Sequence, residues 1–272
     1  MSSYKLDRRT HKWIKKGRGK GSGKDYLPWL TIHDFSSSGR SHRIWGTKTQ
    51  RTHHLFSDLE LKTFLFLEWH TSVEDIREQF PLIIDDTVEI AEQHSISHPR
   101  FGEHLKVMSS DFLVDTNNKN CPQFAIQVKY NSQMFEKRTV EKIRLERLYW
   151  QRKGIPYFII TEEHIPKAVS DNMKWLYPAQ SVIEDLQEIH DLTSRYFDFF
   201  QSNPNVKISQ AAVMIDQIDS LPPGESLQKM RSLMAQRVFT FDISKDWKKL
   251  CVNELNAIVD VELLRNRYAA NQ

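Results

Sequence analysis

The chain has 272 residues, of which 39% are hydrophobic, and carries a formal net charge of +3. These values suit two domains of ordinary size, and no apolar run approaches the roughly 20 residues that span a bilayer. The basic N-terminus lacks the apolar block of a signal peptide, and two widely separated cysteines provide neither a disulfide framework nor a zinc site, so we expect a soluble, cytoplasmic protein.

Positive charge is concentrated at the N-terminal end. Residues 1–54 hold 13 lysines and arginines against three aspartates, so the rest of the chain is net acidic. Such a segment gains affinity for nucleic acid by releasing counterions, although a solvated, disordered tail is an alternative. The stretch KKGRGKGSGK (15–24) is not a P-loop, because no Gly-Lys pair precedes Ser or Thr; we expect a flexible basic segment. We expect residues 1–54 as a whole to be partly flexible and packed on the domain that follows. The candidates for DNA contact are Lys15, Lys16, Arg18, Lys20, Lys24, Arg40, Arg43, Arg51, His53 and His54.

Residues 55–165 predict a compact α/β domain. Helical spacing after Ser57, a good N-cap, predicts a helix over 58–69, and SVEDIREQFPL (72–82) predicts a strand stopped by Pro81. A polar excursion separates this strand from a hairpin over 109–130. The charged segment that follows, 135–154, predicts a helix, and IPYFIIT, 155–161, a buried strand.

Residues 166–272 predict a second, mainly helical domain. Helical stretches recur there without a comparable strand run. Within 208–242, two helices around the turn SLPPG precede VFTFDI, a pattern that fits a helix-turn-helix or winged-helix variant. A protein-docking helical domain is an equally good interpretation, because the second helix offers few basic side chains.

The hairpin strand QFAIQVKY (123–130) interrupts its own apolar pattern. Its period of two places Gln127 and Lys129 on one face, with the other face in the core. If the hairpin is symmetric about Lys119, Asp111 lies opposite Gln127. A carboxylate, an amide oxygen and an ammonium would then be gathered together.

That set of groups suits phosphodiester hydrolysis with Mg²⁺. The ion prefers hard oxygen ligands, and Asp111, the Gln127 amide and the Val128 backbone carbonyl offer them. Lys129 would position the attacking water or neutralise the transition state, and a depressed pKa would let it act as a base. Alternatively, Lys129 pairs with a surface carboxylate on an ordinary half-exposed strand.

Two further acids are candidates. Glu60 belongs to SDLE, a capping box in which it would reach back to the Ser57 N–H, yet the first turn of a helix across the sheet can also aim an acid at the strand ends. Glu146, in the helix after the hairpin, is a possible accessory acid, although an ordinary glutamate on the helix face is the better interpretation. His94 and His98 have helical spacing, but Pro99 follows them and we expect a loop.

The order of elements and acids resembles the restriction-endonuclease-like superfamily, in which an Asp precedes an acid-x-Lys strand. Longer stretches are similar to the TnsA family of transposon-end endonucleases, from about residue 17 to about residue 177: GKDYLPWLTIHDF and its continuation to FLEW, IREQFPL, SSDFLVD and FAIQVK. This resemblance implies an α/β nuclease domain, with a mixed sheet flanked by helices, followed by a helical, winged-helix-like C-terminal domain.

The resemblance also implies roles and partners. It assigns Glu60, Asp111, Gln127 and Lys129 to catalysis, with the first three and the Val128 carbonyl as ligands of Mg²⁺, for which Mn²⁺ can substitute. By this resemblance, Glu60 would bind the metal in addition to capping its helix. The superfamily usually has an acid where this chain has Gln127, but the closer family agrees with the glutamine. The implied reaction is cleavage of the 5′ (non-transferred) strands at transposon ends in a prokaryotic cytoplasm, beside a DDE-type transposase and an AAA+ regulator that the C-terminal domain contacts. The alternatives are a free-standing restriction or repair nuclease and a catalytically silent DNA-binding scaffold.

Overall fold

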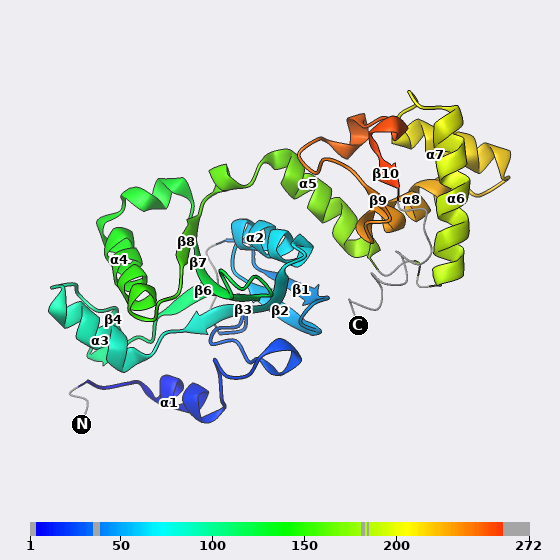
Figure 1. Ribbon diagram of the computed structural model, residues 1–272. Helices are drawn as coiled ribbons and strands as arrows, with labels where there is room; N and C mark the ends of the chain where they lie inside the picture. Colours follow the sequence, from blue (N-terminus) through cyan, green and yellow to red (C-terminus); the bar gives the residue numbers. More distant parts are fainter. Residues whose placement is uncertain (1–3, 35–38, 181–182, 184, 258–272) are drawn as a thin grey trace. The chain divides into compact units, whose positions relative to one another are not determined.

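The computed structural model describes residues 4–34, 39–180, 183 and 185–257. The chain divides into two compact units, Met1–Ile165 and Pro166–Gln272, which we describe separately (Figure 1). Among the described residues, no helix combines the length and the apolar character that crossing a membrane requires.

A four-stranded mixed sheet organises the first unit, in the order β3-β6-β7-β8. β6 pairs antiparallel with both β3 and β7, whereas β8 joins β7 in parallel through a helical crossover. The strands are β3 (Val73–Pro81), β6 (Ser109–Thr116), β7 (Gln123–Val128) and β8 (Tyr157–Ile160).

The predicted hairpin register is confirmed. Phe112 pairs with Ile126 and Val114 with Phe124, and the same register continued by one residue places Asp111 level with Gln127. The prediction of one core face on β7 was too simple, however. Ala125 and Ile126, which point to opposite faces, are both almost completely buried, because helices cover both sides of the strand.

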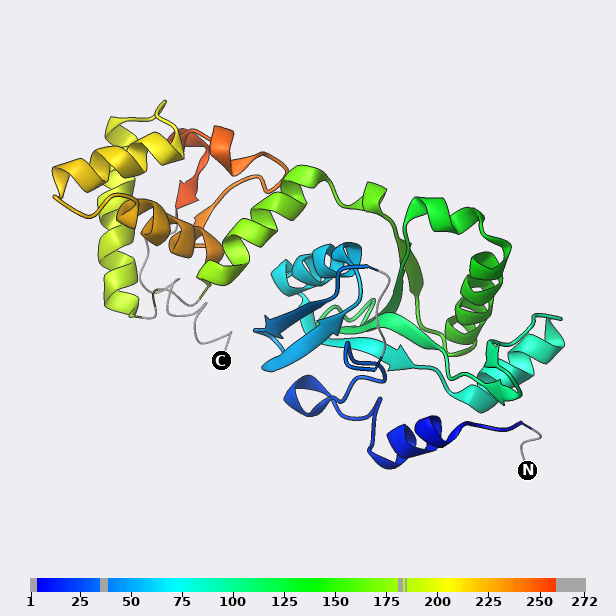
Figure 2. The same ribbon diagram turned by 180° about the vertical axis from the view of Figure 1, so that it is seen from behind.

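Two helices lie on opposite sides of the strands (Figures 1 and 2). α2 (Asp58–Trp69) begins after Ser57, whose hydroxyl accepts a hydrogen bond from the Glu60 N–H, as predicted. α4 (Lys137–Arg152) follows the 3₁₀ helix η2 (Asn131–Phe135) and forms the helical connection between the parallel strands β7 and β8. Tyr149 and Trp150 of α4 pack into the core, together with Leu145, against Leu113 of β6 and Ala125 of β7.

The polar excursion between β3 and β6 contains structure that the sequence analysis missed. It holds α3 (Ile84–Gln93) and a small two-stranded sheet of β4 (Arg100–Phe101) and β5 (His104–Leu105). α3 packs against α4. His94 and His98 lie after α3 in a loop, as expected.

Residues before α2 are also folded. They form α1 (Arg8–Lys15), the 3₁₀ helix η1 (Gly23–Asp25) and an antiparallel pair, β1 (His42–Gly46) with β2 (Arg51–Leu55). The expectation that 15–24 is a flexible segment was wrong: Gly19 and Leu27 are joined by a backbone hydrogen bond, and the Gly23 N–H donates to Asp75 of β3. The glycines allow this path, since Gly19 has a φ of +79° and a Cβ there would come within 2.1 Å of the Pro81 ring.

The second unit is mainly helical, as predicted. A short antiparallel pair, β9 with β10, accompanies its helices, and α7 packs on α8 across the SLPPG turn. The winged-helix-like character of this unit stays a prediction. Its elements are α5 (Lys167–Leu176), α6 (Leu186–Ser202), α7 (Ile208–Ile218), α8 (Glu225–Ala235), β9 (Phe239–Thr240), β10 (Asn256–Ala257), and 3₁₀ turns at Tyr177–Ala179, Trp247–Lys249 and Val252–Glu254; a further 3₁₀ turn, Glu162–His164, belongs to the first unit.

Candidate active site

Asp111 is the centre of the candidate site. Its side chain is buried in β6, and its Oδ2 accepts a hydrogen bond from the backbone N–H of Val128 at 2.7 Å. Lys129 Nζ lies 3.6 Å from the same oxygen. The predicted grouping of Asp111 with the end of β7 is therefore present, and the carboxylate is held against the neighbouring strand.

The end of β7 presents two more oxygens. Gln127 is buried, and its Oε1 has no hydrogen-bond partner among the residues that the structure describes. The carbonyl oxygen of Val128 accepts from Lys129 Nζ at 2.9 Å. A buried amide oxygen without a partner is unfavourable unless it has a ligand, so Gln127 is in the state expected of a group that binds a cation.

Glu60 lies in the first turn of α2 and caps it, and its carboxylate is electrostatically coupled to Asp111. Its Oε2 accepts from the Phe56 N–H at 2.9 Å, one residue earlier than the predicted Ser57 N–H, and its Oε1 accepts from the Ser57 hydroxyl at 3.1 Å. Burial and the negative charge of Asp111 raise the pKa of Glu60 to about 8. The two carboxylates therefore repel each other when both are ionised. A cation between them would relieve that repulsion.

Glu146 is not an ordinary glutamate on the helix face, contrary to the sequence analysis. It is buried in α4, and the Ser110 hydroxyl donates to its Oε1 at 2.5 Å. The Trp150 indole N–H in turn donates to Ser110 at 2.8 Å. Burial raises the pKa of Glu146 to about 8, and the charge of Asp111 adds to the shift, so Glu146 belongs to the same electrostatic cluster.

The pKa of Lys129 is raised, which favours its charged form. Burial alone would lower the pKa of Lys129, but the charges of Asp111, Glu146 and Glu60 outweigh burial and raise it. The notion of a depressed pKa at Lys129 was therefore wrong. The alternative of a surface ion pair is also wrong, because the partner, Asp111, is buried.

These residues fit a divalent cation bound by oxygen. Two carboxylates, one amide oxygen and one backbone carbonyl are ligands that hard cations accept. The described residues contain no group of three or more His, Cys, Asp and Glu side chains placed to hold a metal.

The proposed DNA-contacting residues fall into two groups. Arg51 and His53 are buried, where both contact the fully buried Glu78, and Arg18 pairs with Asp34 and lies over the Trp13 ring. These contacts leave the three side chains little freedom to reach DNA, because Arg51 and His53 are engaged by Glu78 of β3 and Arg18 is engaged by Asp34. His54 is half-buried beside His33. The remaining candidates, Lys15, Lys16, Lys20, Lys24, Arg40 and Arg43, are exposed.

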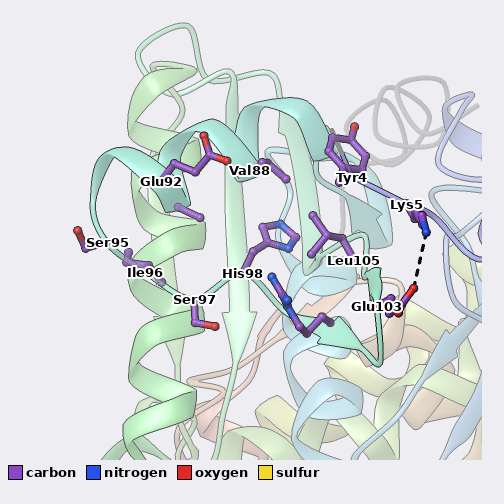
Figure 3. A pocket seen from close by; sticks show the side chains of 12 residues that line it. Tyr4, Lys5, Val88, Glu92, Ser95, Ile96, Ser97, His98, Glu103 and Leu105 are labelled. Carbon is purple, nitrogen blue, oxygen red and sulfur yellow. Dashed lines mark ion pairs between the residues drawn. The ribbon is translucent and has the colours of Figure 1, made fainter. Parts of the chain in front are cut away.

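A surface concavity in the first unit does not contain the candidate site (Figure 3). Its lining includes Tyr4, His98 and the ion pair of Lys5 with Glu103. His98 Nε2 lies 3.0 Å from the Thr87 hydroxyl, and its Nδ1 lies 3.1 Å from the Pro99 carbonyl. Burial lowers the pKa of His98. This histidine is therefore a satisfied core residue and not a metal ligand.

Two residues of the site escaped the sequence analysis. Ser110 precedes Asp111 and bridges Glu146 to Trp150. Gln79, in β3, donates to Asp111 Oδ1 at 3.2 Å. Nothing in their local sequence distinguishes them, because each acts through a partner more than 30 residues away along the chain.

A mixed sheet that joins an aspartate on one strand to a Gln-x-Lys strand, with a glutamate from an earlier helix, is the arrangement expected of a restriction-endonuclease-like nuclease. Residues 70–162 match the family model described as TnsA-like endonuclease N terminal, and residues 164–243 match TnsA endonuclease C terminal. The chain is 44% identical to the transposon Tn7 transposition protein TnsA of Escherichia coli over 263 aligned residues. The alignment covers 95% of this chain and 94% of that protein. The chain belongs to the TnsA endonuclease family.

Proposed function

We propose that this endonuclease cleaves the 5′ (non-transferred) strands at transposon ends during cut-and-paste transposition, with Mg²⁺ as its ion and Mn²⁺ as a substitute. The partnerless Gln127 oxygen, buried beside Asp111, is the observation that carries the metal assignment. The family and the transposition protein to which the chain is similar support the DNA substrate.

Glu60, Asp111, Gln127 and the Val128 carbonyl would hold the ion. When bound, Mg²⁺ lowers the pKa of a coordinated water and shields charge on the leaving oxygen. The Val128 carbonyl accepts a hydrogen bond from Lys129 Nζ with one lone pair, and its second lone pair can still be given to the ion. Glu60 must lose its proton, since its pKa is about 8.

Lys129 supplies fixed positive charge at the scissile phosphate. Because its pKa is raised, it stays protonated at neutral pH and orients the attacking water or offsets negative charge in the transition state. Glu146 is an accessory acid: at neutral pH it is largely protonated and keeps the Ser110 hydroxyl and the Trp150 indole in place behind Asp111.

The remaining surfaces would position DNA and partners. The exposed lysines and arginines of residues 15–43 suit contact with the DNA backbone, which needs charge but no base readout. We assign a DDE-type transposase and an AAA+ regulator as partners, with the second unit as the partner-binding part. Support for the transposase rests on the similarity to a transposition protein.

End-labelled transposon-end DNA, incubated in Mg²⁺ with and without the cognate transposase and regulator, tests this function. The expected result is cutting of the 5′ strand only when the partners are present. Cutting by the isolated chain would instead favour a free-standing nuclease. Assembly with the partners without any 5′-strand cutting would favour a silent scaffold.

A further inference from the structure

Gln79 occupies an unusual backbone position opposite Asp111. In β3, Glu78 pairs with Phe112 and Phe80 with Ser110, so the register places Gln79 level with Asp111. Within β3, all of which is described, Gln79 alone has a positive φ, 49°. A residue with a Cβ is strained in this left-handed region, and such strain persists where the surroundings enforce it.

The Gln79 side chain is buried between two groups of β6. The Ser109 hydroxyl donates to Gln79 Oε1 at 3.1 Å, and Gln79 Nε2 donates to Asp111 Oδ1 at 3.2 Å. The orientation of the amide follows from chemistry, since a carboxylate only accepts hydrogen bonds and the amide nitrogen must therefore face Asp111.

The backbone of Gln79 is fixed from the other side. Its carbonyl accepts a hydrogen bond from the Trp29 N–H at 3.2 Å, and Trp29 packs edge-on against Trp13. A glycine would adopt this φ without strain, but it would lack the amide. The left-handed conformation thus places the amide between Ser109 and Asp111.

Asp111 is consequently held at both oxygens. Val128 N–H binds Oδ2 and Gln79 binds Oδ1, so the carboxylate cannot rotate freely. Groups behind a metal ligand orient it and commonly change metal affinity by roughly 10- to 100-fold when removed.

We propose that Gln79 is a positioning residue that presents Asp111 to the divalent cation, with Ser109 fixing the direction of the amide. This inference rests on the proposed metal site. Both polar ends of the Gln79 amide are engaged by protein groups, so Gln79 is not assigned as a metal ligand. It acts through the orientation of the Asp111 carboxylate, which predicts an effect on metal affinity and not on the fold as a whole.

Titration of the full-length protein with Mn²⁺ alone, followed by electron paramagnetic resonance of the free ion, tests the inference without any cleavage. Gln79→Met keeps the length of the side chain but removes both hydrogen bonds. Gln123→Met is the matched control, because it removes a comparable hydrogen bond from a β7 amide to Asp115, at the far end of β6 from Asp111. Asp111→Ala tests the metal site itself.

The expected result is a dissociation constant for Mn²⁺ raised roughly tenfold or more in Gln79→Met, unchanged in Gln123→Met, and no specific binding in Asp111→Ala. Equal binding by wild type and Gln79→Met, with binding lost in Asp111→Ala, would overturn the role of Gln79 while leaving the metal site. Undiminished binding by Asp111→Ala would overturn the metal site and, with it, this inference.

Ser109→Ala provides a second variant if Gln79→Met does not fold. It leaves the strained residue intact but frees the amide to turn, so a smaller increase in the dissociation constant is expected, and wild-type affinity would overturn the proposal. In cleavage assays Gln79→Met should need more Mg²⁺ and approach the wild-type rate at saturation. A uniform loss at every Mg²⁺ concentration would instead show a structural effect and contradict the inference.

Discussion

The backbone N–H of Val128 donates to Asp111 Oδ2 across the β6–β7 pair, at 2.7 Å. This bond joins Asp111, a proposed metal ligand, to Val128, the residue between Gln127 and Lys129. The position of the carboxylate is thus set by strand pairing, while its charge acts on the pKa values of Glu60, Glu146 and Lys129.

Glu60→Gln should change the pH dependence of stability in metal-free protein. The folded protein keeps the Glu60 proton up to about pH 8, whereas the unfolded chain loses it near 4.5, so wild-type stability falls as pH rises through that window. The variant lacks this slope and gains relative stability, on the order of a few kcal/mol, between pH 5 and pH 8.5.

Thermal unfolding in EDTA across this pH range measures the effect. Glu92→Gln, which changes an exposed glutamate on α3, is the control and should follow wild type. A constant difference between Glu60→Gln and wild type at every pH would contradict the raised pKa. Added Mn²⁺ should stabilise wild type more at high pH, where Glu60 has lost its proton.

Lys129→Met should bind Mn²⁺ at least as tightly as wild type. The ammonium donates to the Val128 carbonyl and lies beside Asp111, so its removal takes away a positive charge that repels a cation from two proposed ligands. Cleavage should nevertheless fall roughly 100- to 1,000-fold, because the charge at the phosphate is lost. Binding weakened in parallel with cleavage would show that Lys129 supports the metal site and does not act on the phosphate.

Glu78→Gln should strongly destabilise the first unit. Arg51 donates to both carboxylate oxygens, and His53 Nδ1 lies 2.8 Å from one of them, all in the buried interior. The variant leaves Arg51 buried without its counter-charge, which costs about 3–5 kcal/mol, measurable by urea unfolding.

Lowering the pH should reduce the difference in unfolding free energy between wild type and Glu78→Gln. Burial alone would raise the pKa of Glu78, but His53 and Arg51 outweigh it and lower the pKa to about 2, below the ordinary 4.5. The stabilisation is fully present above 4.5 and is lost as pH falls toward 2. A gap between wild type and variant that stays constant down to pH 2 would refute this assignment.

Two glycines form a matched pair for the N-terminal loop. Gly17 and Gly19 have φ values of +75° and +79°, but only at Gly19 would a Cβ meet the Pro81 ring. Gly17→Ala should cost about 1 kcal/mol for the left-handed backbone, and Gly19→Ala an additional 1–3 kcal/mol for the clash. Equal losses of unfolding free energy in the two variants would show that the loop does not pack on β3 as described.

Local signals in the sequence predicted α2 and the site hairpin well. The cap at Ser57 and the spacing that follows it fix α2, and the alternation of QFAIQVKY places Gln127 with Lys129. What failed depends on partners distant in sequence. Arg51 and His53 were interpreted as DNA contacts because their partner, Glu78, lies on another strand and cannot be recognised from the local sequence. Glu146 read as a surface acid because its burial depends on Ser110 and the sheet behind it.

The β1–β2 pair and α3 were missed for a related reason. β2 contains RTHHL, whose polar side chains conceal the alternation of a strand, since two of them point into the interior. α3 begins without a side-chain cap, and its apolar positions are sparse. Residue chemistry suggested Asp111, Gln127 and Val128 as metal ligands, but a Gln-x-Lys strand by itself is equally compatible with an ordinary sheet. The resemblance to the family favoured the metal site and added Glu60 to it.

Strand-resolved cleavage of labelled transposon ends by complexes containing wild type, Asp111→Ala or Lys129→Ala, with cognate transposase and regulator in Mg²⁺, tests the central claim most directly. We predict that both variants lose cutting of the 5′ strand while 3′-strand cutting by the transposase continues, which also shows that the complexes assembled. Wild-type cutting of the 5′ strand by Asp111→Ala and Lys129→Ala would show that this hairpin is not the nuclease site.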